Sequence, residues 1–118
     1  MKVVAVVTDL MLYSRIESAA RVAGVDLARV DSPADASPDA DLILVDWSAR
    51  RPDWTDALRA RSDARVILFG PHTDLQAHAD ARAAGLGPML ARSKFVAELP
   101  SLVVRRGARP PQTAPEFP

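Results

Sequence analysis

The stretch Asp41-Leu42-Ile43-Leu44-Val45-Asp46 places four consecutive aliphatic residues between two aspartates. An apolar run this short, without polar alternation, is typical of a parallel strand that is covered on both faces. Two similar runs, Val3 to Val7 and Val66 to Phe69, lie before and after it in the chain. The three runs predict the centre of a buried parallel sheet.

Weaker strands and helical segments alternate with these runs. Strands are predicted over Asp26 to Val30 and Pro88 to Ala91, and helices over Leu12 to Ala23, from about Asp53, over Leu75 to Ala84, and from about Ser93 towards Arg105. Asp53 and Ser93 are expected to cap their helices, Gly24 and Gly85 to end theirs, and Pro100 to interrupt or kink the last one.

The segment from Asp31 to Ala40 is too short and too rich in proline for a full helix, although Ser32-Pro33 can begin a single turn. The alternation of strands and helices predicts an α/β fold, a flavodoxin-like three-layer sandwich. Its five-stranded parallel sheet is expected in the order 2-1-3-4-5, with the second helix shortened. We expect one domain over residues 1–105 and a disordered, proline-rich tail over residues 106–118.

Composition narrows the function classes. The 118 residues carry 15 basic and 15 acidic side chains, so no basic excess favours nucleic acid or a membrane surface as partner. The absence of cysteine excludes disulfides and thiolate catalysis. No apolar stretch is long enough to span a bilayer, and the N-terminus does not have the form of a signal peptide. We expect a cytoplasmic protein.

In an open parallel sheet the working site lies beyond the carboxyl ends of the strands. The residues expected there are Thr8 and Asp9, Asp46 to Ser48, Gly70 to His72, and Arg92. At these positions the sequence resembles the response regulator receiver (CheY-like) family of two-component signalling, over about residues 2 to 104.

The resemblance assigns a role to each position. Asp41 to Asp46 matches the third-strand motif and places Asp46 at the phosphoacceptor position. Thr8-Asp9 stands where the family has an acidic pair, so one carboxylate is missing. Gly70 stands at the switch position, where the family has Thr or Ser, and Arg92-Ser93 replaces Lys-Pro. The resemblance is therefore to a degenerate receiver.

Chemistry indicates what these departures change. Asp9 and Asp46, with the Ser48 carbonyl as a family-like third ligand, form a weakened candidate site for Mg²⁺. Gly70 has no side chain to bond a phosphoryl oxygen. Arg92 keeps a positive charge that could contact phosphate, but its fork is no geometric substitute for lysine.

Each candidate site residue can also be explained by a purely structural role. Asp46 can simply cap a loop, and Asp9 can cap the first helix as well as bind a metal. We expect Thr8, His72 and His78 to be ordinary loop or surface residues and Trp47 to pack against a neighbouring helix. The pair Arg50-Arg51 is expected in an exposed loop, although it could attract an anion.

Three functions remain open at this point. The first is an atypical, stand-alone receiver-like domain that is not an enzyme and acts through a protein partner, such as a histidine kinase or a downstream protein. Its contact face, or a homodimer face, is expected over residues 75–104. The second is a response regulator phosphorylated on Asp46, and the third is a small-ligand or nucleotide-binding domain that uses the same strand-end crevice.

Overall fold

The computed structural model describes residues 1–104 and contains one parallel sheet of five strands in the order β2-β1-β3-β4-β5. The strands are β1 (Lys2–Val6), β2 (Asp26–Val30), β3 (Leu42–Asp46), β4 (Arg65–Gly70) and β5 (Leu90–Ala91). The helices are α1 (Leu10–Ala23), α2 (Trp54–Arg59), α3 (Leu75–Ala83) and α4 (Arg92–Leu102), with single turns η1 (Pro33–Asp35) and η2 (Trp47–Ala49). The predicted fold class and strand order are confirmed.

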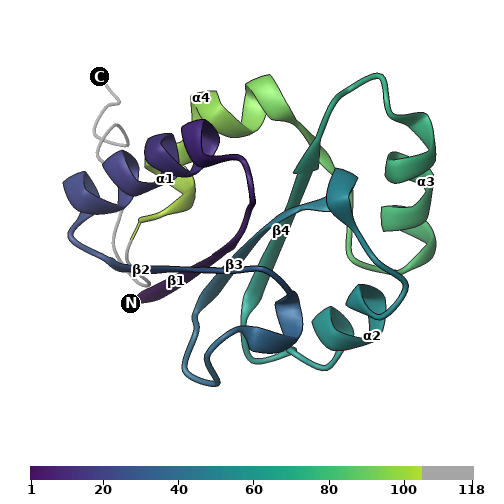
Figure 1. Ribbon diagram of the computed structural model, residues 1–118, viewed down its shortest axis with the longest axis horizontal. Coiled ribbons are helices and arrows are strands. Elements are labelled where there is room, and N and C mark those ends of the chain that lie inside the picture. The colour runs from purple at the N-terminus through teal and green to yellow at the C-terminus, as the bar shows by residue number, and fades with distance from the viewer. Residues whose placement is uncertain (105–118) are drawn as a thin grey trace, which may run out of the picture.

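The sheet is the middle of three layers, with α1 and α4 on one face and α2 and α3 on the other (Figure 1). Alternate residues of each central strand enter opposite cores, as the strand period of two requires. Leu42 and Leu44 of β3 pack in the core under α1 and α4, whereas Ile43 and Val45 pack in the core under α2 and α3. Both faces of β3 are therefore covered, which explains its unbroken apolar run.

The connection from β2 to β3 contains the single turn η1 where a full helix would otherwise cover the sheet. Ser32 accepts a hydrogen bond from the amide of Ala34 at 3.3 Å, and Pro33 supplies the first residue of the turn. The predicted single turn at Ser32-Pro33 is confirmed, and so is the shortened second helix.

Two predicted helix caps are wrong. Asp53 precedes α2 but has helical backbone angles (φ −78°, ψ −11°) and makes no side-chain cap, whereas a capping residue normally has extended angles. Ala91 precedes α4, so Ser93 lies inside the helix and cannot cap it. Gly24 ends α1 with φ of 69°, the left-handed conformation that was expected of it.

Pro100 was predicted to interrupt or kink the last helix; the interruption is wrong, because α4 continues to Leu102, and the kink stays a prediction. Leu99, Leu102 and Val103 are buried around Pro100, and this packing keeps the last turn helical against the intrinsic preference of proline. The predicted continuation towards Arg105 is wrong for Val103 and Val104, because α4 ends at Leu102, while Arg105 itself and the predicted tail over 106–118 lie outside the described residues. Among residues 1–104, no helix is both long and apolar enough to cross a membrane.

The two tryptophans differ in how their indole N–H groups are bonded, and this predicts different costs of substitution. Both are buried, but Nε1 of Trp47 donates to the carbonyl of Ala77 at 3.0 Å, whereas Nε1 of Trp54 has no hydrogen-bond partner among residues 1–104. Trp47→Phe removes a hydrogen bond worth about 1 kcal/mol. Trp54→Phe removes an unsatisfied donor, so its loss of stability should be the smaller of the two.

Urea unfolding followed by far-UV circular dichroism measures both variants against the parent chain. Each variant loses a similar volume of aromatic packing, so each serves as the control of the other. A larger loss for Trp54→Phe than for Trp47→Phe would contradict the hydrogen-bond assignment.

Candidate functional site

The carboxyl ends of four strands meet at one edge of the sheet. The parallel register pairs Val6 with Val45, Asp46 with Phe69, and Gly70 with Ala91. Residues that directly follow these strands share this edge: Thr8, Asp9, Trp47, Ser48, Pro71, His72 and Arg92. The residues predicted for the site therefore lie where sheets of this kind bind ligands.

Asp9 is held from two sides. Its Oδ1 accepts hydrogen bonds from the amides of Met11 (3.0 Å) and Leu12 (3.1 Å) and so caps α1. Its Oδ2 accepts a hydrogen bond from Nη2 of Arg92, the first residue of α4. The guanidinium of Arg92 is the main reason that the pKa of Asp9 lies below its ordinary value, and the amide of Leu12 adds to this effect. The predicted helix cap is thus confirmed.

Asp46 is the buried charged residue at the end of β3, with 9% of its surface exposed. Its Oδ1 accepts hydrogen bonds from the amide of Ser48 at 3.2 Å and from the hydroxyl of Ser48 at 2.5 Å. Asp46 therefore caps the turn η2 that follows it, as its structural interpretation predicted. Its roles as phosphoacceptor and metal ligand remain predictions.

Gly70 lies at the end of β4, and the space beside it is filled by Met89. A Cβ atom added to Gly70 would lie 3.1 Å from the Met89 sulfur and 3.2 Å from its Cε, with the Cβ of Ser48 at 3.7 Å. Met89 itself is buried. A side chain at position 70 would therefore be in tight contact with the Met89 thioether, which would have to shift by a few tenths of an ångström.

Several solved structures share this arrangement of strands and helices. A response regulator receiver protein from Burkholderia phymatum is 20% identical over 94% of this chain and 98% of its own, with a TM-score of 0.66. A Francisella response regulator receiver domain is 16% identical over 86% of this chain and 95% of its own (TM-score 0.61). A Sinorhizobium meliloti protein described as the pilus assembly protein CpaE2 is 14% identical over 82% of this chain and 95% of its own (TM-score 0.55).

The chain has the receiver fold. No protein-family model matches the sequence, and no curated protein matches it. At such low identity the likeness extends to the fold and not to the chemistry of the strand-end edge, because one fold can carry unrelated functions. What this receiver fold does must therefore be argued from its own side chains.

The site residues fall into two bonded groups. Asp9 pairs with Arg92, Asp46 bonds Ser48, and no hydrogen bond joins the two groups within residues 1–104. Phe95 lies one turn after Arg92 on α4 and stacks on Phe69 of β4, with ring centroids 4.0 Å apart. This stacking holds the first turn of α4 and so positions Arg92. The contact that was proposed between Arg92 and phosphate stays a prediction, since its guanidinium is bonded to Asp9.

A group of residues that sequence reasoning did not connect links the turn η2 to α3. Arg50 donates to Oδ2 of Asp80 from Nε (3.1 Å) and Nη2 (2.5 Å), and its guanidinium carbon lies 5.7 Å from the centroid of the Trp47 ring. Gln76 donates to the other oxygen of Asp80, and hydrogen bonds from Gln76 and Arg50 lower the pKa of Asp80. The spacing of Gln76 and Asp80 on one helix could have been noticed, but the contact with Arg50 depends on the fold.

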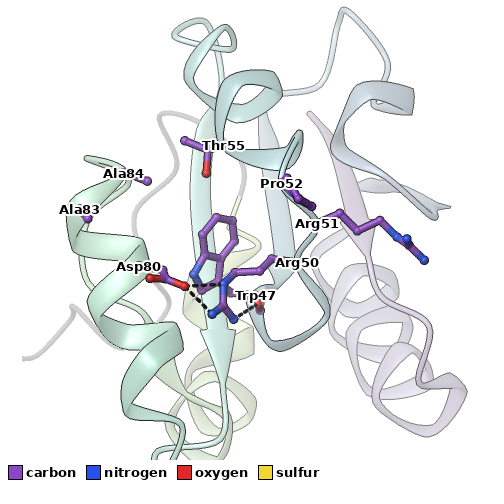
Figure 2. A pocket seen from close by; sticks show the side chains of 8 residues that line it. All are labelled: Trp47, Arg50, Arg51, Pro52, Thr55, Asp80, Ala83 and Ala84. Atoms are coloured by element: carbon purple, nitrogen blue, oxygen red, sulfur yellow. Dashed lines mark hydrogen bonds and ion pairs between the residues drawn. The ribbon is translucent and has the colours of Figure 1, made fainter.

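Trp47, Arg50 and Asp80 line an open hollow of about 600 Å³ on the α2 and α3 side of the sheet. Figure 2 shows Arg50 between Trp47 and Asp80, whereas Arg51 points away from them. The predicted packing of Trp47 is confirmed. Arg50 is half-buried and paired with Asp80, which differs from the exposed loop position expected for it, whereas Arg51 is exposed as expected. Attraction of an anion by the arginine pair stays a prediction.

The remaining candidates take no part in the bonded groups. Thr8 and His72 are exposed and His78 is half-buried. Within the described chain, none of the three side chains makes a hydrogen bond or ion pair. Their interpretation as ordinary loop and surface residues is consistent with these positions.

The crowding between Gly70 and Met89 predicts a coupled pair of substitutions. Gly70 does not have a positive φ, so a larger residue there meets only the thioether and not a backbone barrier. Gly70→Ser alone should be destabilising, and Met89→Ala alone should cost about 2–5 kcal/mol through the cavity that it leaves. In the double variant each change relieves the other, so the summed loss should shrink by about 0.5–3 kcal/mol.

Chemical unfolding of the four chains of this double-mutant cycle gives the coupling free energy. Gly85→Ser with Met89→Ala provides a control cycle, because nothing lies within 4 Å of a Cβ at Gly85, and the strain of serine at its φ of 72° is the same in both serine chains and cancels in the coupling. Additive losses in the Gly70 cycle would show that the thioether does not fill this space.

Proposed function

We propose that the chain is an atypical receiver-like signalling domain that acts through protein contacts, without the usual phosphorylation switching. The observation that carries the proposal is the Met89 thioether in the space beside Gly70. In the receiver family, which the sequence resembles, a hydroxyl at this position bonds the phosphoryl group. A thioether is at most a weak acceptor and has no proton to donate.

The receiver fold supports a signalling role, since two of the structures that share it are response regulator receivers. A third structure with this fold is described as a pilus assembly protein. Because the fold alone does not determine a function, the proposal depends more on the contact surfaces of the domain than on its fold. The domain is proposed to be non-enzymatic and to bind either a histidine kinase or a downstream signalling protein.

The face formed by α3, β5 and α4, within residues 75–104, is the proposed contact surface for the partner or for a second copy. Leu75, at the start of α3, has 75% of its surface exposed, and Ala79 beside it on the same helix is also exposed. An exposed leucine next to a small residue lets another chain pack closely. Ala77 and Ala81 contribute nothing to this face, because both are fully buried against the sheet.

The proposed loss of switching predicts the response to beryllofluoride, which mimics an aspartyl phosphate. With Mg²⁺ and beryllofluoride added, amide-resolved NMR should show no shifts that depend on Asp46 and reach α4. Asp46→Asn is the matched control, because it keeps the side-chain shape and removes the acceptor. Shifts that spread to α4 in the parent chain and vanish in Asp46→Asn would instead make phosphorylation on Asp46 the leading function.

The proposed contact surface predicts that two substitutions of an exposed aliphatic residue by glutamate have different effects on binding. Leu75→Glu should weaken self-association or partner binding by about ten-fold or more, because it buries a charge at the contact. Val22→Glu is the control, since Val22 is also a strongly exposed aliphatic residue (91% exposed) but lies on α1, outside the proposed face. Sedimentation analysis measures self-association, and titration with a captured partner measures binding. Equal affinities for both variants would remove this face from the proposal.

A further inference from the structure

The ion pair between Asp9 and Arg92 joins two helix starts that are 83 residues apart in the chain. Asp9 is the residue that caps α1, and Arg92 is the first residue of α4. Both oxygens of the carboxylate are occupied, one by two backbone amides of α1 and the other by the guanidinium. The positive charge that neutralises Asp9 is therefore supplied by the chain itself.

The receiver resemblance implies a Mg²⁺ ion at this edge, and the donor atoms of Asp9 and Asp46 decide whether such an ion fits. Mg²⁺ requires oxygen ligands in near-octahedral geometry at about 2 Å and usually takes one or two carboxylates. Asp9 has no oxygen without a donor, and one oxygen of Asp46 accepts two hydrogen bonds from Ser48. Residues 1–104 contain no group of three or more His, Cys, Asp or Glu side chains that could hold a metal ion. These residues do not fit the ion.

We propose that the guanidinium of Arg92 is the resident cation of this site. It neutralises Asp9, keeps divalent cations out and ties the start of α1 to the start of α4. An arginine side chain stays protonated at any physiological pH and cannot dissociate from the chain as a metal ion does. The charge state of the site is therefore fixed and independent of the metal concentration.

The packing around Arg92 places its guanidinium at Asp9. Ala91 of β5, the residue before it, pairs with Gly70 of β4 in the sheet. Phe95, one turn further along α4, stacks on Phe69 with an interplanar angle of 8°. Strand pairing and aromatic stacking thus fix the start of α4, while β1 and the cap of α1 fix Asp9. The pair is still partly exposed, so a dissolved ion can reach it.

The experiment is a titration of the full chain with Mn²⁺, read by paramagnetic broadening of amide signals, and with Mg²⁺, read by shifts. The parent chain should show no broadening centred on Asp9 and Asp46. Arg92→Ala removes one positive charge from the site. Because the site is partly exposed and the charge is close, its removal should tighten Mn²⁺ binding there by about ten-fold or more. Arg92→Lys keeps the charge and should remain as weak as the parent chain.

Two further variants make the result specific. Arg82→Ala removes an exposed arginine of α3 that has no ion pair within residues 1–104, and it should leave Mn²⁺ binding unchanged. Adding Asp9→Asn to Arg92→Ala should abolish the gained binding. The dispersion of the amide spectrum shows whether each variant is folded.

Two outcomes would overturn the inference. One is a parent chain that binds Mn²⁺ at Asp9 and Asp46 as tightly as Arg92→Ala does. The other is a folded Arg92→Ala chain that gains no binding. Neither outcome decides the proposed function, which depends on the beryllofluoride response of the parent chain.

Discussion

The central strands of the sheet have almost no contact with water, and this constraint decides where polar chemistry can be placed. Every residue of β3 is buried, and so are all but the first residue of β1. Unpaired polar side chains inside such strands would lose their hydration without compensation. The polar groups of the core strands are therefore found where the strands end, and the parallel direction brings those ends together at one edge.

The same constraint explains how much of the fold could be predicted from the sequence. Unbroken apolar runs mark strands that are covered on both faces, so β1, β3 and β4 were found nearly to the residue, and the strand order followed from the alternation with helices. The errors fell at helix ends. Asp53 and Ser93 are residue types that favour caps. Asp53 does not cap α2 because its backbone angles are helical, and Ser93 does not cap α4 because that helix already begins at Arg92. Pro100 shows the same limit, because tertiary packing overrides a local preference.

The candidate site was predictable in position but not in its contacts. The predicted strand ends and the receiver resemblance placed Asp9, Asp46, Gly70 and Arg92 at one edge. They did not reveal that Arg92 bonds Asp9 or that Met89 fills the space at Gly70, because both contacts join residues from different elements. A sequence shows that a hydroxyl is missing at a position, whereas only the fold shows what has taken its place. The difference matters, because a side chain restored at position 70 also requires the Met89 thioether to shift.

The connection between η2 and α3 has a mechanical consequence. Trp47 and Arg50 follow Asp46 directly, and they bond the backbone of Ala77 and the carboxylate of Asp80 on α3. A turn with two independent attachments to a helix cannot shift without breaking one or taking the helix along. The turn beside Asp46 and the helix α3 are therefore mechanically coupled.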